Sequence, residues 1–492
     1  HCPVFGSCAY FEQGKALVGA QVIVVNHDLL LSTLGTKTLP ELDNSFLILD
    51  EAHHLPSTAI DQFACQTDLS RLSWVDHLLS RALRVGTELD VAEVADMPAS
   101  AAQCRAALQK LAQLVMQHYA EALRQHDGGF RGVPRVRVPR GQLPTEFAPV
   151  LADVLAAAEV WMEALRAISK ALRAEIKDKP DEAKRLSALY AQLGQWAPKL
   201  EGAYACAELL AQEALPSDPH AVTPAKWFTL RMQGELAVVH AHASPVLPGA
   251  TLRGRLWGQV RAAVLTSATL TSAGRFDYFL REVGLHGDDA VSVLQVASPF
   301  DYPRQGRLRI VSTQADPKHA HDFNTEVVAR LMLDLQQVKH GALVLFTSRE
   351  QMRMATEALS AELRPRVWIQ NLLPRAMLLA QHRERVGQGL PSIVFGMQSF
   401  GEGLDLPGRL CEDLFILKLP FAPPDDPVGE ARAEWVRGQG RDAFMDLVVP
   451  ATAMRLAQWV GRAIRTEEDE AHVHCYDRRL AQTNYGRLLL QS

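Results

Sequence analysis

The sequence lacks long uncharged apolar runs, has few cysteines and carries little net charge. No such run in the chain approaches the roughly 20 residues that a membrane-spanning helix needs, so we expect no membrane partner. The seven cysteines are an odd number and are widely spread, which favours a reduced, cytoplasmic protein over a disulfide framework. Because the formal net charge is −5 and the pI is about 6.4, any nucleic acid must be bound by local basic surface.

The composition and the hydrophobic periodicity of the sequence change along the chain, and they predict an α/β fold with several domains. The length of 492 residues is too great for one core. Residues 21–65 and 226–297 contain strand-like apolar runs, and residues 298–492 alternate strands with helices, which predicts doubly wound parallel sheets. Residues 66–225 have helical periodicity and are predicted to form a helical insertion. Strands are expected at 21–27, 46–50, 236–239, 262–265, 342–346, 392–395, 414–419 and 472–476, and helices at 103–123 and 150–176.

Two adjacent carboxylates end an apolar run in the segment Phe46-Leu-Ile-Leu-Asp50-Glu51-Ala-His53. The run is typical of a buried strand in a parallel sheet, and ligands bind beyond the carboxyl ends of such strands. At that place Asp50 is suited to hold a Mg²⁺ ion that bridges nucleotide phosphates, and Glu51 to activate a water molecule. The alternative is a strand that simply ends in a solvated acidic turn.

Two further segments place polar residues after predicted strands. Thr266-Ser-Ala-Thr269 follows the strand at 262–265, where its hydroxyl groups can bond the acidic pair, although a capped turn is the simpler interpretation. The loop Phe395-Gly-Met-Gln-Ser-Phe-Gly-Glu-Gly403-Leu-Asp405 lets the backbone approach a ligand closely. In this loop Asp405 can accept a hydrogen bond from a ribose or an arginine.

The segment Gln458-Trp-Val-Gly461-Arg462-Ala-Ile-Arg465 combines an amide, a glycine and two guanidinium groups. On a helix these residues lie at i, i+3, i+4 and i+7, and therefore on one face. Paired arginines suit the charge that develops on a transferred phosphoryl group, where an arginine finger is worth about 10³–10⁵ in rate. The alternative is a solvated amphipathic helix, in which the glycine costs about 1 kcal/mol without a purpose.

In this order, the segments resemble the motifs of helicase superfamily 2, most closely the iron–sulfur branch that includes XPD and DinG-type helicases. The resemblance covers essentially the whole chain, and the helical insertion matches the arch domain of that branch. The matching motifs are the DEAH box Asp50–His53, motif III Thr266–Thr269, motif IV Leu343–Ser348, motif V Gln398–Asp405 and motif VI Gln458–Arg465. The segments Ser298-Pro-Phe, Tyr476-Asp-Arg-Arg-Leu and Asn484-Tyr-Gly-Arg are similar to DinG-type sequences.

The resemblance implies two RecA-like domains, residues 21–65 with 226–297 and residues 298–492, that use ATP and Mg²⁺. The catalytic residues that it implies are Asp50, Glu51, Gln458, Arg462 and Arg465, with Asp50 as the Mg²⁺ ligand. Nucleotide contacts are implied for Asp50, His53, Gly403, Asp405, Gln458, Arg462 and Arg465. Coupling of the nucleotide state to DNA is implied for His53, Ser267 and Thr269.

Residues 1–20 are similar to the end of an iron–sulfur module. By the resemblance, Cys2 and Cys8 are the last two of four thiolates that hold a [4Fe–4S] cluster, whereas their spacing alone favours an incidental pair. The remaining cysteines are expected to be small buried hydrophobic residues.

One departure from the family concerns the phosphate-cradling loop Gly-x-x-x-x-Gly-Lys-Ser/Thr, which these residues lack. Gly14-Lys15 is followed by Ala16 and has no earlier glycine at the required place. The chain begins at His1, and we expect it to be a fragment of a longer protein. We therefore expect the fragment alone to bind ATP poorly and to hydrolyse none.

The resemblance implies a DNA helicase that moves 5′→3′ on single-stranded DNA and unwinds forks, D-loops and R-loops in DNA repair or replication. The implied partners are single-stranded DNA, DNA and RNA–DNA junctions and a single-stranded-DNA-binding protein, and the implied state is a monomer in the cytoplasm. Two alternatives stay open at this point. One is an ATP-driven translocase or remodeller without strand separation, and the other is a non-enzymatic DNA-binding scaffold.

Two other patterns are compatible with binding. His240-x-His242 and His472-x-His474 each place two imidazoles on one strand face, but no third metal ligand is evident in the sequence, which favours ordinary histidines. The basic segment from Phe130 to Arg140 has the composition of a DNA-backbone contact or of a solvated loop.

Overall fold

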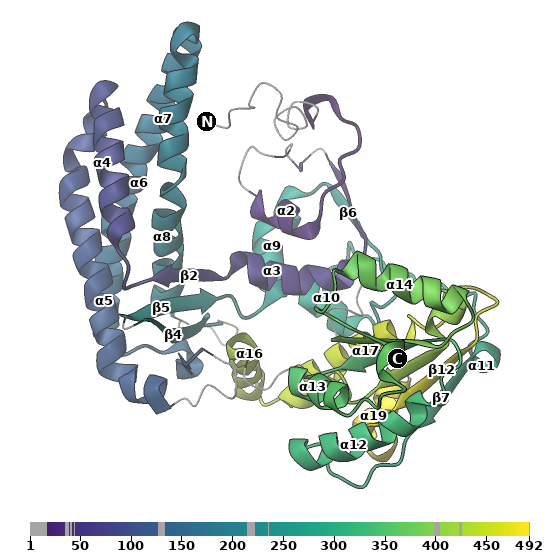
Figure 1. Ribbon diagram of the computed structural model, residues 1–492. Coiled ribbons are helices and arrows are strands. Elements are labelled where there is room, and N and C mark those ends of the chain that lie inside the picture. Colours follow the sequence, from purple (N-terminus) through teal and green to yellow (C-terminus); the bar gives the residue numbers. More distant parts are fainter. Residues whose placement is uncertain are drawn as a thin grey trace. The chain divides into compact units, whose positions relative to one another are not determined.

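The computed structural model describes residues 17–34, 39, 42–43, 45–125, 133–213, 222–234, 236–397, 404–422 and 426–491 (Figure 1). By its internal contacts the chain divides into two compact units. The first unit comprises His1–Leu49, His54–Val264 and Pro424–Gln439, and the second comprises Asp50–His53, Leu265–Pro423 and Gly440–Ser492. The predicted α/β class is confirmed by the parallel sheet and the helices around it. The predicted domain boundaries follow motifs rather than packing, and they stay a prediction.

The second unit is built on a six-stranded sheet with the order β7-β12-β11-β8-β10-β9, in which every pair of neighbours is parallel. Its strands are β7 Gly306–Ile310, β8 Gly341–Phe346, β9 Val367–Ile369, β10 Ser392–Met397, β11 Asp413–Ile416 and β12 Ala471–Cys475. Its helices are α10 Asp277–Val283, α11 Tyr302–Gln305, α12 Ala320–Leu335, α13 Arg349–Glu357, α14 Arg375–Gly387, the π-helix Phe444–Val448, α17 Val449–Val460, α18 Arg479–Gln482 and α19 Asn484–Leu490. The strands predicted at 342–346, 392–395, 414–419 and 472–476 are confirmed as β8, β10, β11 and β12.

Continuous apolar runs explain why the centre of this sheet is buried on both faces. Every residue of β8 is buried. Because side chains alternate along a strand, Leu343 and Leu345 enter one core cluster, which also contains Trp459. Val344 and Phe346 enter the cluster on the opposite face. The strand ends are thereby held in place, and the loops that follow them start from fixed positions.

Gly341 starts β8 at a point where the main chain of Leu410 passes very close. A Cβ atom at this position would lie 2.2 Å from the Leu410 carbonyl oxygen. A shift of that carbonyl group would weaken another hydrogen bond, because its oxygen also accepts from His382 Nε2 at 2.9 Å. We expect Gly341→Ala to lower the free energy of unfolding by about 2–3 kcal/mol, measured as a lower midpoint in chemical denaturation. Gly387→Ala is the matched control, since nothing lies within 4 Å of an added Cβ there; equal midpoints for the two variants would contradict the prediction.

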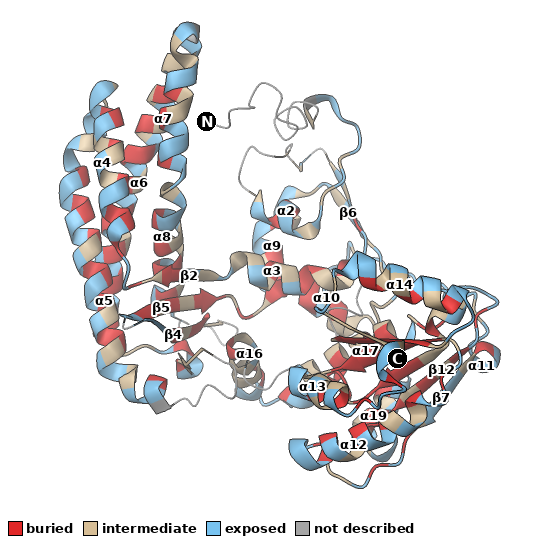
Figure 2. Ribbon diagram, viewed as in Figure 1, coloured by how far each residue is buried: buried red, intermediate tan, exposed pale blue. Residues whose placement is uncertain are grey.

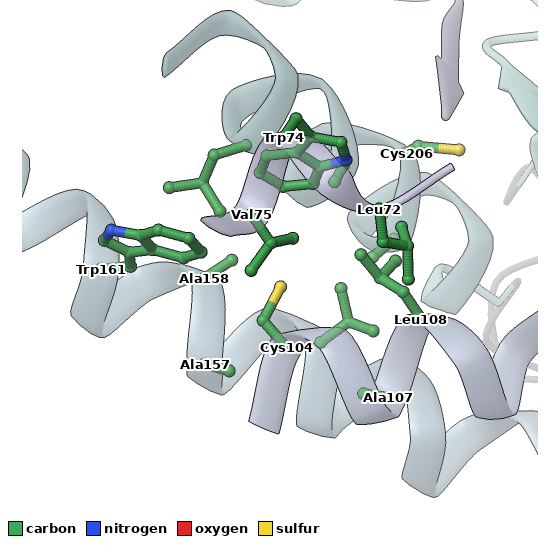
Figure 3. Close-up of a cluster of buried hydrophobic side chains, with 14 of the residues drawn as sticks. Leu72, Trp74, Val75, Cys104, Ala107, Leu108, Ala157, Ala158, Trp161 and Cys206 are labelled. Carbon is green, nitrogen blue, oxygen red and sulfur yellow. The ribbon is translucent and has the colours of Figure 1, made fainter. Parts of the chain in front are cut away.

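The first unit contains long amphipathic helices that pack around an apolar core. Its helices are α2 His27–Ser32, α3 Leu55–Phe63, α4 Ser73–Glu88, α5 Met97–Gln125, α6 Phe147–Asp178, α7 Ala183–Gly194, α8 Ala197–Ala211, α9 Pro248–Arg255 and α16 Pro427–Gly438. The helices predicted at 103–123 and 150–176 are confirmed within α5 and α6. Trp74 and Trp161 stack in the core at 6.2 Å between ring centroids, and Cys104 packs in the same cluster (Figure 3).

A four-stranded antiparallel sheet lies beside these helices and was not predicted. Its order is β2-β5-β4-β3, with β2 Cys65–Asp68, β3 Arg135–Arg137, β4 Ala225–Gln233 and β5 Leu236–Ser244. The strand predicted at 236–239 therefore exists as the start of β5, but it belongs to an antiparallel hairpin instead of a parallel sheet. Phe228 and Ala241 face the helical core, and Trp227 and His242 lie on the other face.

β1 (Phe46–Leu49) and β6 (Ala262–Leu265) pair as a separate two-stranded sheet. The strand predicted at 46–50 is confirmed as β1, but the prediction that it is buried is wrong, because Phe46 and Ile48 are each 68% exposed. By contrast, the helices α5 and α6 carry both buried and exposed residues along their length (Figure 2). The strand predicted at 21–27 is also wrong: residues 22–26 form no strand, and Asn26 caps α2. Among the described residues no strand pairs with this segment, and backbone groups without a ladder partner do not make a sheet. No helix of the described part is long and apolar enough to cross a membrane.

Candidate functional site

The acidic motif forms a tight turn directly after β1. Glu51 has a φ of 48°, in the left-handed region that few non-glycine residues adopt. The turn is closed by a hydrogen bond from the Glu51 amide to Asp50 Oδ1 at 3.0 Å. The next amide, of Ala52, donates to the Thr266 carbonyl oxygen at 3.0 Å. Such backbone strain is kept only where the surroundings hold it, and it is frequent at functional sites.

Ser267 joins this turn to the hydroxyl-rich segment. Its Oγ atom donates to Glu51 Oε2 at 3.2 Å and lies 2.8 Å from His53 Nδ1. The same Oγ also accepts the amide of Thr269 at 3.3 Å, which closes a local turn. No helix begins here for Ser267 to cap, since α10 starts at Asp277, so the bond to Glu51 is the part of the prediction that holds. His53 Nδ1 is 3.3 Å from Glu51 Oε2. The structure therefore brings Glu51, His53 and Ser267 together, as the motif pattern predicts.

Gln458 reaches the same segment from helix α17. Its Nε2 atom donates to Thr269 Oγ1 at 3.1 Å. Thr269 is thereby bonded through its amide to Ser267 and through its hydroxyl group to Gln458. A continuous set of hydrogen bonds runs from Glu51 to α17.

The two arginines of this segment are placed differently from the prediction. Helix α17 ends at Val460 and Gly461 is its C-cap residue, so Arg462 and Arg465 follow the helix and do not share its face with Gln458. The helical interpretation is wrong because the chain turns after the glycine to bury Ala463 and Ile464. Both guanidinium groups nevertheless converge on one acceptor. Arg462 Nη1 and Arg465 Nη2 donate to the Leu404 carbonyl oxygen at 3.2 and 3.3 Å.

That acceptor belongs to the glycine-punctuated loop of the sequence pattern. Leu404 is buried and Asp405 is exposed, and the main-chain oxygen of Asp405 accepts a hydrogen bond from Arg383 at 3.3 Å. Gly403 lies outside the described residues. The structure therefore associates Arg462 and Arg465 with this loop, and among the described residues no bond joins Arg465 to Asp50 or Glu51.

Asp50 has the chemistry expected of a magnesium ligand. It is exposed, its Oδ1 atom accepts the Glu51 amide, and carboxylate oxygens are the ligands that Mg²⁺ prefers. A single carboxylate with water and phosphate oxygens is a common arrangement for this ion. The residue therefore fits the ion.

Four of the five cysteines in the described part are buried, as the sequence predicts, and the fifth is half-buried. Cys65 is half-buried, and Cys104, Cys206, Cys411 and Cys475 are buried, all as free thiols. Burial raises the pKa of Cys104 to about 11 and that of Cys411 to about 12, which keeps both thiols neutral and poor metal ligands. Cys2 and Cys8 lie outside the described residues. Among the residues that the structure describes, no group of three or more metal-binding side chains is found.

The histidine pairs serve as structural residues. His242 stacks on Trp227 at 5.1 Å between ring centroids, and its Nε2 atom lies 2.9 Å from Thr229 Oγ1. His472 and His474 lie near Asp413, but no group of three or more histidine, cysteine, aspartate or glutamate residues among those described is arranged to hold a metal ion.

Burial of His242 makes the first unit sensitive to acid. Burial, with a smaller contribution from His240, lowers the pKa of His242 to about 4. In the unfolded chain His242 binds a proton near pH 6.5, whereas in the folded chain it stays neutral until about pH 4. The free energy of unfolding therefore falls as the pH drops from about 6.5 towards 4. We expect a loss on the order of 2 kcal/mol at pH 4, measured by denaturation as a function of pH. His242→Gln should remove that part of the slope; an unchanged slope would contradict the assignment.

Comparison with known proteins adds family evidence to this geometry. The DEAD_2 family profile matches residues 3–72, and the profile described as Helicase C-terminal domain matches residues 331–492. The ATP-dependent DNA helicase DinG of Photobacterium profundum is 31% identical over 502 residues, which cover 100% of this chain and 70% of that protein. The chain belongs to the DinG family of helicases.

A second relative agrees with this family, and one solved structure has a similar fold. The ATP-dependent DNA helicase DinG of Salmonella choleraesuis is 28% identical over 506 residues, covering 100% of this chain and 68% of that protein. A solved structure named XPD_Helicase shares the fold with a TM-score of 0.52 at 15% identity, covering 98% of this chain and 74% of the other. As a DinG-family member the protein is a DNA helicase and an ATP hydrolase.

One residue that supports the arginines in this DinG-family chain was missed from the sequence. Asp469 is buried, and its Oδ2 atom accepts the amides of Arg465 at 2.6 Å and Thr466 at 2.9 Å. Its Oδ1 atom accepts the Thr466 hydroxyl group at 2.6 Å. The pattern Thr466-Glu-Glu-Asp469 is a hydroxyl residue with an acidic residue three positions on, which is the signal of a capped turn.

Proposed function

We propose that this protein hydrolyses ATP to move 5′→3′ along single-stranded DNA and to unwind forks, D-loops and R-loops in DNA repair or replication. The observation that carries the proposal is the set of hydrogen bonds from Glu51 through Ser267 and Thr269 to Gln458. It joins the acidic motif to the segment that bears the arginines. Family membership supports the coarser statement of a DNA helicase.

In the proposed mechanism Glu51 is the general base. Its carboxylate accepts a proton from the attacking water, whose oxygen forms a bond to the γ-phosphorus as the bond to the ADP oxygen breaks. The Ser267 hydroxyl group and the left-handed turn hold the Glu51 side chain in one position. Asp50 would hold Mg²⁺, which would neutralise charge on the phosphate oxygens.

The proposal assigns Arg462 and Arg465 to the charge on the transferred phosphoryl group, with Gln458 beside them. Their shared acceptor, the Leu404 carbonyl oxygen, keeps both guanidinium groups next to the loop that contains Gly403 and Asp405. We propose the same loop, with His53, as a nucleotide contact. A carbonyl oxygen is a weak partner for two cations, and it is readily exchanged for a phosphate.

Ser267 and Thr269 are proposed to couple the nucleotide to DNA. Protonation of Glu51 during hydrolysis removes a charged acceptor of the Ser267 hydroxyl group and weakens that bond. Because Ser267 also accepts the Thr269 amide, the change is passed on to the next bond in the set.

Three further parts of the proposal rest on the sequence pattern. Cys2 and Cys8 are proposed as two ligands of a [4Fe–4S] cluster, and the protein as a cytoplasmic monomer. The sequence lacks a Gly-Lys-Ser/Thr phosphate loop, and we expect these 492 residues alone to show no ATP hydrolysis. DNA-stimulated phosphate release from the isolated chain would contradict that expectation.

Strand displacement by the full-length protein tests the proposed activity. A duplex with a 5′ single-stranded tail should open with ATP, whereas the same duplex with a 3′ tail should stay closed. A translocase without strand separation would release streptavidin from a biotinylated strand end but leave both duplexes paired. A DNA-binding scaffold would bind the tails without releasing phosphate. Either of these two results would overturn the proposal.

A further inference from the structure

Helix α16 belongs by sequence to the C-terminal helicase domain but packs on the antiparallel sheet of the first unit. The helix, Pro427–Gly438, lies inside the region that matches the Helicase C-terminal domain. It nevertheless packs in the first unit, against β4 and the turn Pro139–Gly141 (Figure 1). The chain on both sides of it, up to Pro423 and from Gly440, belongs to the second unit.

A fork of charged hydrogen bonds holds α16 in this position. Arg137, on the edge strand β3, donates from Nε to Glu430 Oε2 at 2.5 Å. Its Nη1 and Nη2 atoms donate to Glu434 Oε2 and Oε1 at 2.8 and 2.5 Å. Bidentate pairing of this kind is among the stronger and more directional contacts between side chains. The Arg137 side chain is 17% exposed and that of Glu434 is 27% exposed.

The turn after β3 is shaped to receive the same carboxylate. Arg140 has a φ of 54°, and its backbone amide donates to Glu434 Oε2 at 2.9 Å. Gly141 follows with a φ of 64°, and a Cβ atom there would lie 2.6 Å from the Pro224 carbonyl oxygen. A left-handed arginine is costly, so the turn is held by its surroundings and the Arg140 amide is fixed towards Glu434 of α16.

The helix itself is poorly stable without this contact. Glu430 and Glu434 are four residues apart, so like charges lie side by side on one face of α16. The helix has 12 residues, a length at which isolated helices are marginal in water. The Arg137 guanidinium group raises the helix's stability by neutralising both carboxylates, and it holds the pKa of Glu434 below its ordinary value.

We propose that α16 is a coupling arm, held on the antiparallel sheet by Arg137, through which nucleotide-driven movement of the C-terminal helicase domain acts on the helical insertion. Arg137 is then a positioning residue that touches neither nucleotide nor DNA. The contact suits this task because it is charged and partly exposed, and so it can be broken and remade more readily than an apolar interface. The inference rests on the proposed function, since it needs a motor that moves.

Arg137→Ala in the full-length protein tests the arm with two separate measurements. Hydrogen exchange should show the α16 amides exchanging at least about 10-fold faster, with β8 and β10 unchanged. DNA-stimulated ATP hydrolysis should stay within about 2-fold of the wild type, while base pairs opened per ATP fall about 10-fold, because a coupling change of this size corresponds to the usual allosteric range. Glu434→Gln should reproduce both effects without removing an arginine, and it covers the case in which Arg137→Ala does not fold.

Two further variants sharpen the result. Arg140→Gln is the control for the loss of a nearby positive charge, because the hydrogen bond from Arg140 to Glu434 comes from its backbone amide and is kept. Arg137→Ala combined with Glu434→Gln should lose no more coupling than either single variant, because both changes remove the same contact.

Three results would overturn the inference. One is α16 exchange that Arg137→Ala leaves unchanged, and another is hydrolysis and unwinding that fall by the same factor. The third is a double variant whose loss of coupling equals the sum of the two single losses, as for independent sites. If the wild type hydrolyses ATP but separates no strands, the proposed unwinding activity is wrong. The coupling arm is then tested by streptavidin displacement per ATP and by the hydrogen-exchange data.

Discussion

Glu51→Gln is expected to reduce ATP hydrolysis by the full-length protein by about 10²–10⁴-fold, the usual contribution of a general base. The amide has the size of the carboxylate and still accepts the Ser267 hydroxyl group, so the turn and its left-handed residue should be kept. The amide cannot take a proton from water at neutral pH. DNA binding and ATP binding should therefore stay close to those of the wild type, as measured by fluorescence anisotropy and by nucleotide titration.

Glu159→Gln, on the exposed side of α6, is the matched control for the change from carboxylate to amide. It should hydrolyse ATP at the wild-type rate. Retained turnover in Glu51→Gln would remove Glu51 from the role of base. Loss of nucleotide binding together with turnover would instead place Glu51 among the groups that bind the nucleotide.

Arg465→Ala is expected to slow ATP hydrolysis by about 10³–10⁵-fold, the effect of removing an arginine finger. The backbone of Arg465 should keep its place, because its amide is bonded to Asp469 and the adjacent Ile464 is buried. The variant then lacks only the guanidinium group that is proposed to stabilise the negative charge on the transferred phosphoryl group. Single-turnover hydrolysis at saturating ATP is the appropriate measurement, since it separates chemistry from nucleotide affinity.

Arg465→Lys provides the comparison for this variant. Lysine keeps the positive charge but lacks the planar fork, so we expect an intermediate rate. An Arg465→Ala protein that hydrolyses ATP normally, and whose DNA binding merely depends less steeply on salt, would identify Arg465 as a phosphate contact with DNA.

Much of the parallel sheet was predictable because its strands are continuous apolar runs. β8 and β10 bury both faces, and this burial leaves a signal in the sequence that does not depend on neighbours. The strand Arg135-Val-Arg137 has no such signal, since it is short and polar and exists only because β4 supplies its ladder. The exposed segment at 21–27 shows the converse: an apolar run forms no strand where it has no partner.

The candidate site was predictable where side chains define it and not where the backbone does. Asp50, Glu51 and Ser267 follow from the order of the motifs, and the structure brings the last two into contact. The Leu404 carbonyl oxygen, which gathers both arginines, is a main-chain atom and has no sequence signal. The end of α17 was not predicted, because the helical spacing was extended through Gly461 to Arg465, whereas the helix ends at Val460 and Gly461 is its C-cap residue.

The attachment of α16 has a consequence for synthesis of the chain. Arg137 and Glu434 are separated by 297 residues, so a ribosome that adds about 5–20 residues per second exposes the edge strand β3 long before its acidic partner emerges. During that delay the strand edge and an unneutralised guanidinium group face solvent or a chaperone. Completion of the first unit is thus a late event in the life of the nascent chain, although most of its residues are made early.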